Sequence, residues 1–270
     1  MSAPYESKHV VDAKAPSTEL LFGGAAVNTV STNHISKWLQ QGWQDFKASP
    51  MNSLVYGLIF AIIGIVFDRL SAISPSFKLS AVAGFLLLGP FLSLGLYELS
   101  RQLERGEKSN FAGSTVAIQH NVNGLILYAF ALGVVMFVWI RVSLVVMGIF
   151  FHQANLIGLS SFELVTALFK LPGGTLFLLI FFATGFLFAL GAFVSGVVTV
   201  PLMLDRKADI VTAVNTSIRA CVKSPVPMAL WAITIAALIG LGIMTYYLAL
   251  IVTAPLVAHA SWHAYRDIVA

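Results

Sequence analysis

The sequence predicts an all-helical membrane protein with six transmembrane helices, arranged as three pseudo-repeated hairpins that are each preceded by an amphipathic interfacial helix. Hydrophobic residues make up 58% of the 270 residues and charged residues only 10%, whereas soluble domains carry about 25% charged residues. The mean hydropathy is +0.86. Long uncharged runs recur along the chain, and one proline-containing pattern occurs three times.

The repeated pattern is a proline late in an apolar run, followed eight residues later by an ionisable residue. Its three copies are Pro90 with Glu98, Pro201 with Asp209, and Pro255 with His263. We interpret each copy as the second helix of a hairpin. The predicted spans are 51–67, 79–97, 122–150, 175–204, 226–242 and 246–265.

The last two spans come from one uncharged run, 226–258. A single helix of that length would exceed the hydrocarbon thickness by about 20 Å. We therefore expect two short helices that turn near 240–245.

Three segments outside the spans have amphipathic periodicity. The first, 33–47, follows a flexible tail at 1–32 and opens the membrane domain, 33–270; a weaker one is 111–122, and the third is 208–222. The first and the third are each followed by Ser-Pro. Trp38 and Trp43 lie on the apolar face of the first helix. Indole rings suit the headgroup boundary, but the same face could instead pack on the helix bundle, and both interpretations stay open.

The charge balance predicts topology and excludes one class of partner. The formal net charge is +4, but so few charges cannot form the clustered basic surface that nucleic-acid binding needs. With six spans, 12 of the 16 Lys and Arg residues fall on the side that holds both termini. The positive-inside rule then places both termini in the cytoplasm.

Two histidines are a candidate metal site. His259 and His263 are four residues apart on one predicted helix, a spacing that can bind one metal ion from one face. A haem with two histidine ligands needs them on opposite sides of the ring, so this pair does not fit one. The alternative is that both rings lie at the cytoplasmic boundary, where amphipathic rings are common.

The ionisable residues of the three copies form a second candidate site. If the hairpins surround a pseudo-threefold axis, Glu98, Asp209 and His263 could converge, and Arg101 and Arg266 could pair with the carboxylates. The cluster would then either join the helix ends to the amphipathic helices or form a site for an ion, a proton or a lipid headgroup.

Three motifs resemble a known family: GPFLSLGLYELSR at 89–101, VPLMLDR followed by TAVNTSIRACVKSP through Pro225, and APLVAHASWHAYR at 254–266. From about Ile35 to the C-terminus, the chain is similar to the bacterial integral membrane family called domain of unknown function 2189. The resemblance implies a multi-spanning inner-membrane protein without an established activity. Some members carry the label of a cytochrome oxidase subunit.

No nucleophile–base set, phosphate-binding glycine loop or cysteine cluster occurs in the sequence, and Cys221 is the single cysteine. We therefore expect neither enzymatic activity nor a cofactor. The leading hypothesis is a scaffold, assembly or regulatory component of a membrane complex, in contact with the lipid bilayer and with other membrane proteins or a second copy of itself. The alternatives are a transporter of an ion or small amphiphile and, third, a respiratory subunit.

Overall fold

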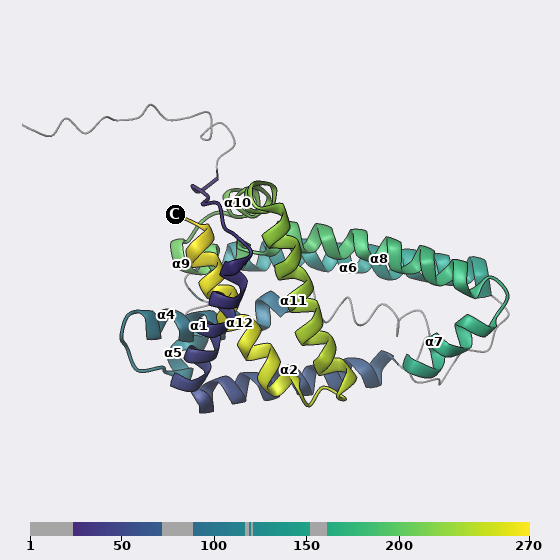
Figure 1. Cartoon of the computed structure of the whole chain (residues 1–270), viewed down its shortest axis with the longest axis horizontal. Coiled ribbons are helices and arrows are strands. Elements are labelled where there is room, and N and C mark those ends of the chain that lie inside the picture. The colour runs from purple at the N-terminus through teal and green to yellow at the C-terminus, as the bar shows by residue number, and fades with distance from the viewer. Residues whose placement is uncertain (1–23, 72–88, 117–118, 120, 152–160) are drawn as a thin grey trace, which may run out of the picture.

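The computed structural model describes residues 24–71, 89–116, 119, 121–151 and 161–270 (Figure 1). These residues are helical apart from an extended segment at 24–31, the connections between helices, and one isolated β-bridge between Val27 and Val269. The predicted all-helical class is confirmed. The helices are α1 (Asn33–Ala48), α2 (Pro50–Ser71), α4 (Leu94–Glu104), α5 (Phe111–Val116), α6 (Val122–Phe151), α7 (Ser161–Lys170), α8 (Gly174–Gly196), α9 (Thr199–Arg206), α10 (Ile210–Lys223), α11 (Pro225–Met244) and α12 (Leu250–Ile268).

Four stretches of the described chain are long and apolar enough to cross a membrane. They are Pro50–Leu70, Val122–Phe151, Gly174–Arg206, which joins α8 to α9, and Pro225–Met244. Most of the predicted span 79–97 lies outside the described residues. The predicted span 246–265 corresponds to α12, which is not among the four. Six spans and their hairpin arrangement therefore stay a prediction.

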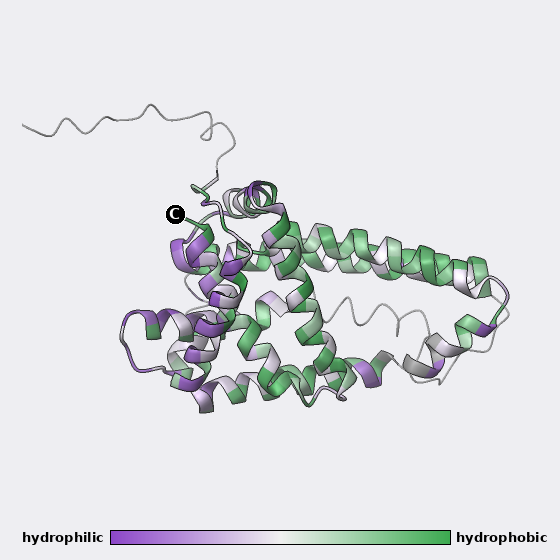
Figure 2. Cartoon of the chain, viewed as in Figure 1, coloured by the Kyte–Doolittle hydropathy of each residue, from purple (hydrophilic) through white to green (hydrophobic). Residues whose placement is uncertain are grey.

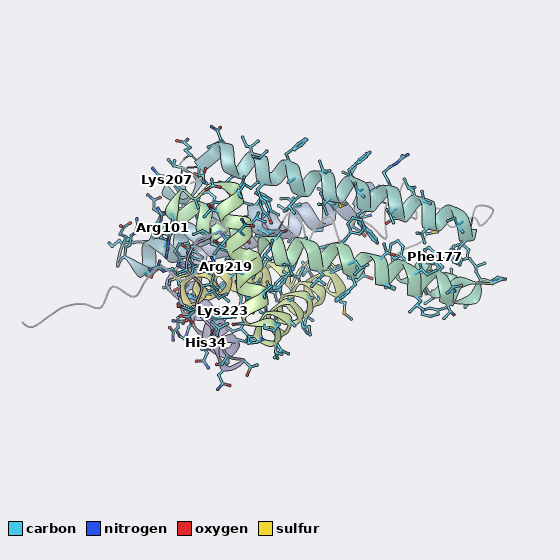
Figure 3. All side chains as sticks on the ribbon, turned by 90° about the horizontal axis from the view of Figure 1, so that it is seen from above. His34, Arg101, Phe177, Lys207, Arg219 and Lys223 are labelled. Atoms are coloured by element: carbon cyan, nitrogen blue, oxygen red, sulfur yellow. The ribbon has the colours of Figure 1, made fainter. Side chains whose placement is uncertain are left out.

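The outward faces of the long helices are apolar, as expected of surfaces that contact lipid. In α6, Phe130 and Ile149 are exposed, and in α8, Leu179 and Phe186 are exposed. Apolar patches of this extent are rare on monomeric soluble proteins. Hydrophobic residues dominate both helices along their length, whereas hydrophilic residues gather at the end of the molecule that holds α1, α4 and α9 (Figure 2). Figure 3 shows the same asymmetry, with Arg101 and Lys207 far from Phe177.

The Ser-Pro pairs produce the same local structure twice. The backbone φ and ψ angles are −136° and 57° at Ser49 and −135° and 61° at Ser224. Each serine N–H donates to the carbonyl four residues earlier, on Asp45 and Ala220 respectively. The proline is then the first residue of the next helix. The N–H of a residue at that position makes no hydrogen bond within the helix, so proline, which lacks an N–H, costs no hydrogen bond there. Both amphipathic helices therefore lead into their apolar helices, α2 and α11, through the same bend.

Pro201 lies inside an apolar run and accounts for the interruption between α8 and α9. Pro201 has no N–H for the carbonyl of Val197, and its ring would clash with that carbonyl in a continuous helix. The chain accordingly leaves helical geometry between Gly196 and Thr199, which separates α8 from α9. This break was not predicted, since 175–204 was expected to be one span. The turn expected between the last two predicted spans occurs at Thr245 to Ala249, just after the predicted position, with positive φ at Tyr246 and Tyr247.

We call the end of the molecule that holds α1, α4 and α9 the polar end. Helix α12 lies at its centre and packs against α1, α2, α4 and α11. Pro255 leaves the carbonyl of Ile251 without its usual helical donor. Gly57 of α2 approaches this carbonyl so closely that an added Cβ would lie 2.0 Å from the oxygen. Gly42 of α1 makes a similar approach, with an added Cβ 2.6 Å from the backbone nitrogen of Ala260. Two glycines thus permit the packing around α12.

The apolar face of α1 packs mainly on this bundle. Trp38 is fully buried, and its ring centroid lies 5.5 Å from that of Trp231 in an edge-on contact. Trp43 stacks on Phe46 and keeps 42% of its surface exposed. Of the two interpretations of α1, packing on the bundle applies to Trp38, and contact with the headgroup region remains open to Trp43.

The close approach of α2 to α12 gives a testable prediction. We expect Gly57→Ala to destabilise the protein by about 1–3 kcal/mol, because the methyl group would force the two backbones apart. Gly133→Ala in α6 is the matched control, since an added Cβ there meets nothing within 4 Å. Thermal unfolding of both variants in the same detergent measures the difference. Equal unfolding temperatures for the two variants would contradict this packing.

Candidate functional site

Three segments that are distant in sequence meet at the polar end of the molecule: α4, α9 and the C-terminal half of α12. They are the segments that carry or follow the repeated prolines. Their ionisable side chains form what we call the charged cluster, which consists of Glu98, Arg101, Glu104, Asp205 and Arg266.

Arg101 links α4 to α9 and is almost buried. Its Nε lies 2.9 Å from Oε2 of Glu98, with side-chain exposures of 11% and 8%. These atoms form an ion pair but are not aligned as a hydrogen bond. On the other side, Nη1 donates to the carbonyl oxygen of Leu204 at 3.2 Å and lies 4.0 Å from Oδ1 of Asp205. Burial of both charges is tolerated because each faces an opposite charge.

Arg266 links α12 to both other segments in a more exposed position. Its Nε donates to Oε1 of Glu104 at 3.0 Å, and its Nη1 lies 3.5 Å from Oδ2 of Asp205. Two neutral groups of α12 also donate hydrogen bonds to these carboxylates. The Tyr265 hydroxyl donates to Asp205 at 2.8 Å, and the Trp262 indole N–H donates to Glu104 at 3.2 Å. Each of these two carboxylates therefore joins α12 to another segment.

The charged cluster contains some of the predicted residues and two that the sequence analysis did not single out. Glu98, Arg101 and Arg266 belong to it. Each arginine faces two carboxylates, of which only Glu98 is among the carboxylates named in the prediction. Glu104 and Asp205 were missed. Glu104 lies one turn beyond Arg101, a spacing that signals an ion-pairing residue on the same helix. Asp205 directly follows the predicted span 175–204, and no local spacing indicates its partner Arg266.

Asp209 lies outside the cluster because it caps a different helix. Its Oδ1 accepts a hydrogen bond from the backbone N–H of Thr212 at 3.0 Å, at the N-terminus of α10. Hydrogen bonds from Thr212 to the carboxylate hold the pKa of Asp209 below its usual value. An aspartate at this position also faces the positive end of the helix dipole. Asp209 thus starts α10 rather than joining Glu98.

The two histidines connect α12 to three other helices. The buried ring of His259 lies between two serine hydroxyls, with Nε2 3.0 Å from Oγ of Ser53 in α2 and Nδ1 2.7 Å from Oγ of Ser100 in α4. His263 Nε2 lies 2.8 Å from Oδ2 of Asp45 in α1. The structure gives both rings protein partners.

Across the residues that the structure describes, no group of three or more His, Cys, Asp or Glu side chains could hold a metal ion. Metal binding by His259 and His263 stays a prediction. The ion pairs and hydrogen bonds around the end of α12 join five helices, α1, α2, α4, α9 and α12.

We predict that Arg101→Gln lowers the free energy of unfolding by about 3 kcal/mol, at the low end for breaking a buried ion pair, because Glu98 would keep its charge without its partner. Arg105→Gln removes the same charge one turn later from an exposed side chain and should cost less than about 1 kcal/mol. Chemical denaturation in one detergent compares the two. A cost for Arg101→Gln no larger than the control's would show that the pair does not stabilise the fold.

The comparisons with known proteins give one positive result. A family model described as predicted integral membrane protein (DUF2189) matches residues 78–205. This range contains α4 to α8 and α9 up to Asp205, and with them most of the charged cluster, but not Arg266. No curated protein matches the chain, and no solved structure matches it. The match agrees with the family resemblance of the sequence motifs: residues 78–205 are similar to the DUF2189 family of predicted integral membrane proteins.

Proposed function

We propose that the protein is a non-enzymatic scaffold, assembly or regulatory component of a membrane complex, located in the bacterial inner membrane with both termini in the cytoplasm. The observation that carries this proposal is the charged cluster. Its arginines face carboxylates from two segments, so the charges are engaged in holding the polar end together. Paired charges of this kind favour a rigid platform over a site that binds and releases an ion.

The packing of the amphipathic helices supports the same proposal. Helix α5 packs on α4, α10 packs on α9, and α1 packs on α12. The first two contacts join elements that are neighbours in the sequence, and the third joins α1 to α12, near opposite ends of the chain. These contacts hold the amphipathic helices against the ends of α4, α9 and α12. The polar end so formed would offer partners a rigid cytoplasmic face.

Transport is the second candidate function, and one observation favours it. Ser53, Ser100 and His259 form a buried chain of hydrogen bonds between α2, α4 and α12. Ionisable groups within a membrane bundle often mark a proton or ion path. If the protein is a scaffold, these three side chains only join helices. Removing the imidazole should then change the stability of the protein without changing any flux of protons or ions.

The experiment is affinity purification of the tagged protein from its native membranes in a gentle detergent, after cross-linking, with mass spectrometry of the products. We expect a stoichiometric partner protein or a second copy, cross-linked to lysines of the polar end such as Lys47 and Lys108. Arg101→Gln should reduce this association, and Arg105→Gln should not.

The result that would overturn the scaffold proposal is a protein that folds normally and is recovered alone from cross-linked membranes. Reconstitution in vesicles then tests transport directly. Proton or ion flux that is lost in His259→Gln, with the unfolding temperature retained, would assign the function to transport.

A further inference from the structure

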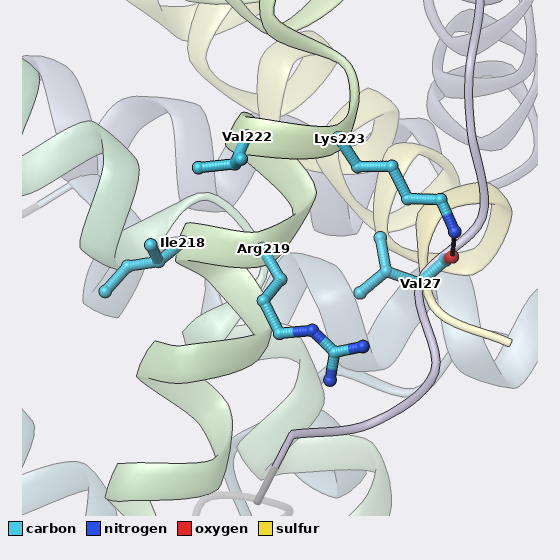
Figure 4. Close-up of a pocket in the computed structure, with 5 residues that line it drawn as sticks. All are labelled: Val27, Ile218, Arg219, Val222 and Lys223. Atoms are coloured by element: carbon cyan, nitrogen blue, oxygen red, sulfur yellow. Dashed lines mark hydrogen bonds between the residues drawn. The ribbon is translucent and has the colours of Figure 1, made fainter. Parts of the chain in front are cut away.

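A groove of about 350 Å³ lies between α10 and the extended segment that precedes α1 (Figure 4). Its lining residues are Val27, Ile218, Arg219, Val222 and Lys223. The groove thus combines three apolar side chains with two basic ones, and it is separate from the charged cluster, with which it shares no residue.

Helix α10 presents its apolar residues outward. Its inner face consists of small or hydroxyl-bearing buried residues, namely Ala213, Thr216, Ser217, Ala220 and Cys221. Its outer face carries Val211, Ile218 and Val222, which are 64%, 38% and 74% exposed. A helix on a water-facing surface has the opposite polarity. The outer face of α10 therefore fits the boundary between headgroups and acyl chains, where amphipathic helices lie in the membrane plane.

The basic side chains are held in place beside this face. The ammonium of Lys223 donates to the carbonyl oxygen of Val27 at 2.6 Å, as Figure 4 shows. The guanidinium of Arg219 donates to the carbonyl oxygen of Ala25 at 3.4 Å. A carbonyl occupies one of the three donors of an ammonium, and no carboxylate within the described ranges forms an ion pair with Lys223. Lys223 is exposed and retains donors for an anion.

We propose that this groove binds an anionic phospholipid, with the headgroup phosphate on Lys223 and Arg219 and an acyl chain along Ile218 and Val222. Lys and Arg bind phosphate oxygens through charge-assisted hydrogen bonds. The acyl chain would contact the apolar wall of the groove, formed by Val27, Ile218 and Val222, and the exposed outer face of α10. A soluble anion would use only the basic half of the groove.

The apolar surface continues from the groove into a candidate membrane span. After the bend at Ser224, α11 exposes Val226 and Ile233, which are 62% and 63% accessible. This helix belongs to a stretch long and apolar enough to cross the bilayer. An acyl chain that leaves the groove can therefore follow α11 into the hydrocarbon, which a soluble partner has no means to do.

The test uses the full chain, purified in a neutral detergent and titrated with phosphatidylglycerol, with native mass spectrometry to count bound lipid. Phosphatidylcholine with the same acyl chains and inorganic phosphate serve as comparison ligands. We expect one phosphatidylglycerol to bind tightly, with much weaker binding of phosphatidylcholine. Inorganic phosphate should compete only weakly, because it lacks the acyl contact.

Two double variants with equal loss of charge separate this site from general attraction. Arg219→Gln with Lys223→Gln should weaken binding of phosphatidylglycerol by at least about tenfold, since each basic group near an anionic lipid contributes about a fivefold factor. Arg105→Gln with Lys108→Gln, on an exposed loop, should leave the affinity unchanged. Equal effects of the two double variants, or equal affinity for the two lipids, would overturn the proposal.

Lys223 also holds the segment at Val27, so its loss could loosen the fold. Two further variants keep the test decisive. Lys223→Arg should retain selective binding, because it keeps both the charge and the donors. Ile218→Ser with Val222→Ser keeps the basic groups but removes the apolar wall, and it should weaken phosphatidylglycerol binding while leaving any binding of inorganic phosphate unchanged. Unchanged lipid affinity in this serine variant would show that the site recognises an anion alone.

Discussion

The constraint on which the structure depends is that charged side chains are costly within hydrocarbon and must either leave it or be paired. The chain has few charges, and the labelled basic side chains gather at one end of the molecule (Figure 3). There the almost buried pair of Glu98 and Arg101 adjoins Asp205, which in turn faces Arg266. The membrane thus forces charges from three distant segments into one place, and their pairing joins those segments.

Helix α12 converts this pairing into a compact polar end. Its proline frees a backbone carbonyl at Ile251, and a glycine of α2 packs directly against it. One turn further, His259 contacts serines of α2 and α4, and His263 contacts Asp45 of α1. The last turn carries Arg266 into the charged cluster. A single helix therefore makes polar contacts with four others, which explains why its sequence contains so few purely apolar positions in its second half.

Local patterns predicted much of this structure. Amphipathic periodicity predicted α1 and α10, and the Ser-Pro pairs predicted the two matching bends. The spacing of Glu98 and Arg101 predicted their pairing, because three residues in a helix place both on one face. What the sequence analysis missed depends on tertiary contacts. The pairing of Asp205 with Arg266 requires α9 and α12 to pack together, which no local pattern indicates.

Asp209 shows why equal spacing did not give equal position. It follows Pro201 by the same number of residues as Glu98 follows Pro90. However, α9 ends at Arg206 and Lys207 adopts a left-handed conformation, so the chain leaves the helix before it reaches Asp209. In the first copy, by contrast, α4 continues past Glu98 to Glu104. Trp38 and Trp43 lie in one continuous helix and differ for another reason: Trp38 contacts Trp231 of α11 and is buried, whereas Trp43 stacks on Phe46 of its own helix and is 42% exposed.

The central claim is that the ends of α4, α9 and α12 emerge together on one side of the membrane. Labelling with a membrane-impermeant thiol reagent tests it most directly, in a Cys221→Ser background that removes the single cysteine. Single cysteines would be introduced by Arg105→Cys, Lys207→Cys, Ala270→Cys and, at the opposite end, Lys170→Cys, all at exposed positions. The account predicts that the first three are labelled from the same side and the fourth from the other. Labelling of any of the first three from the side of the fourth would contradict it.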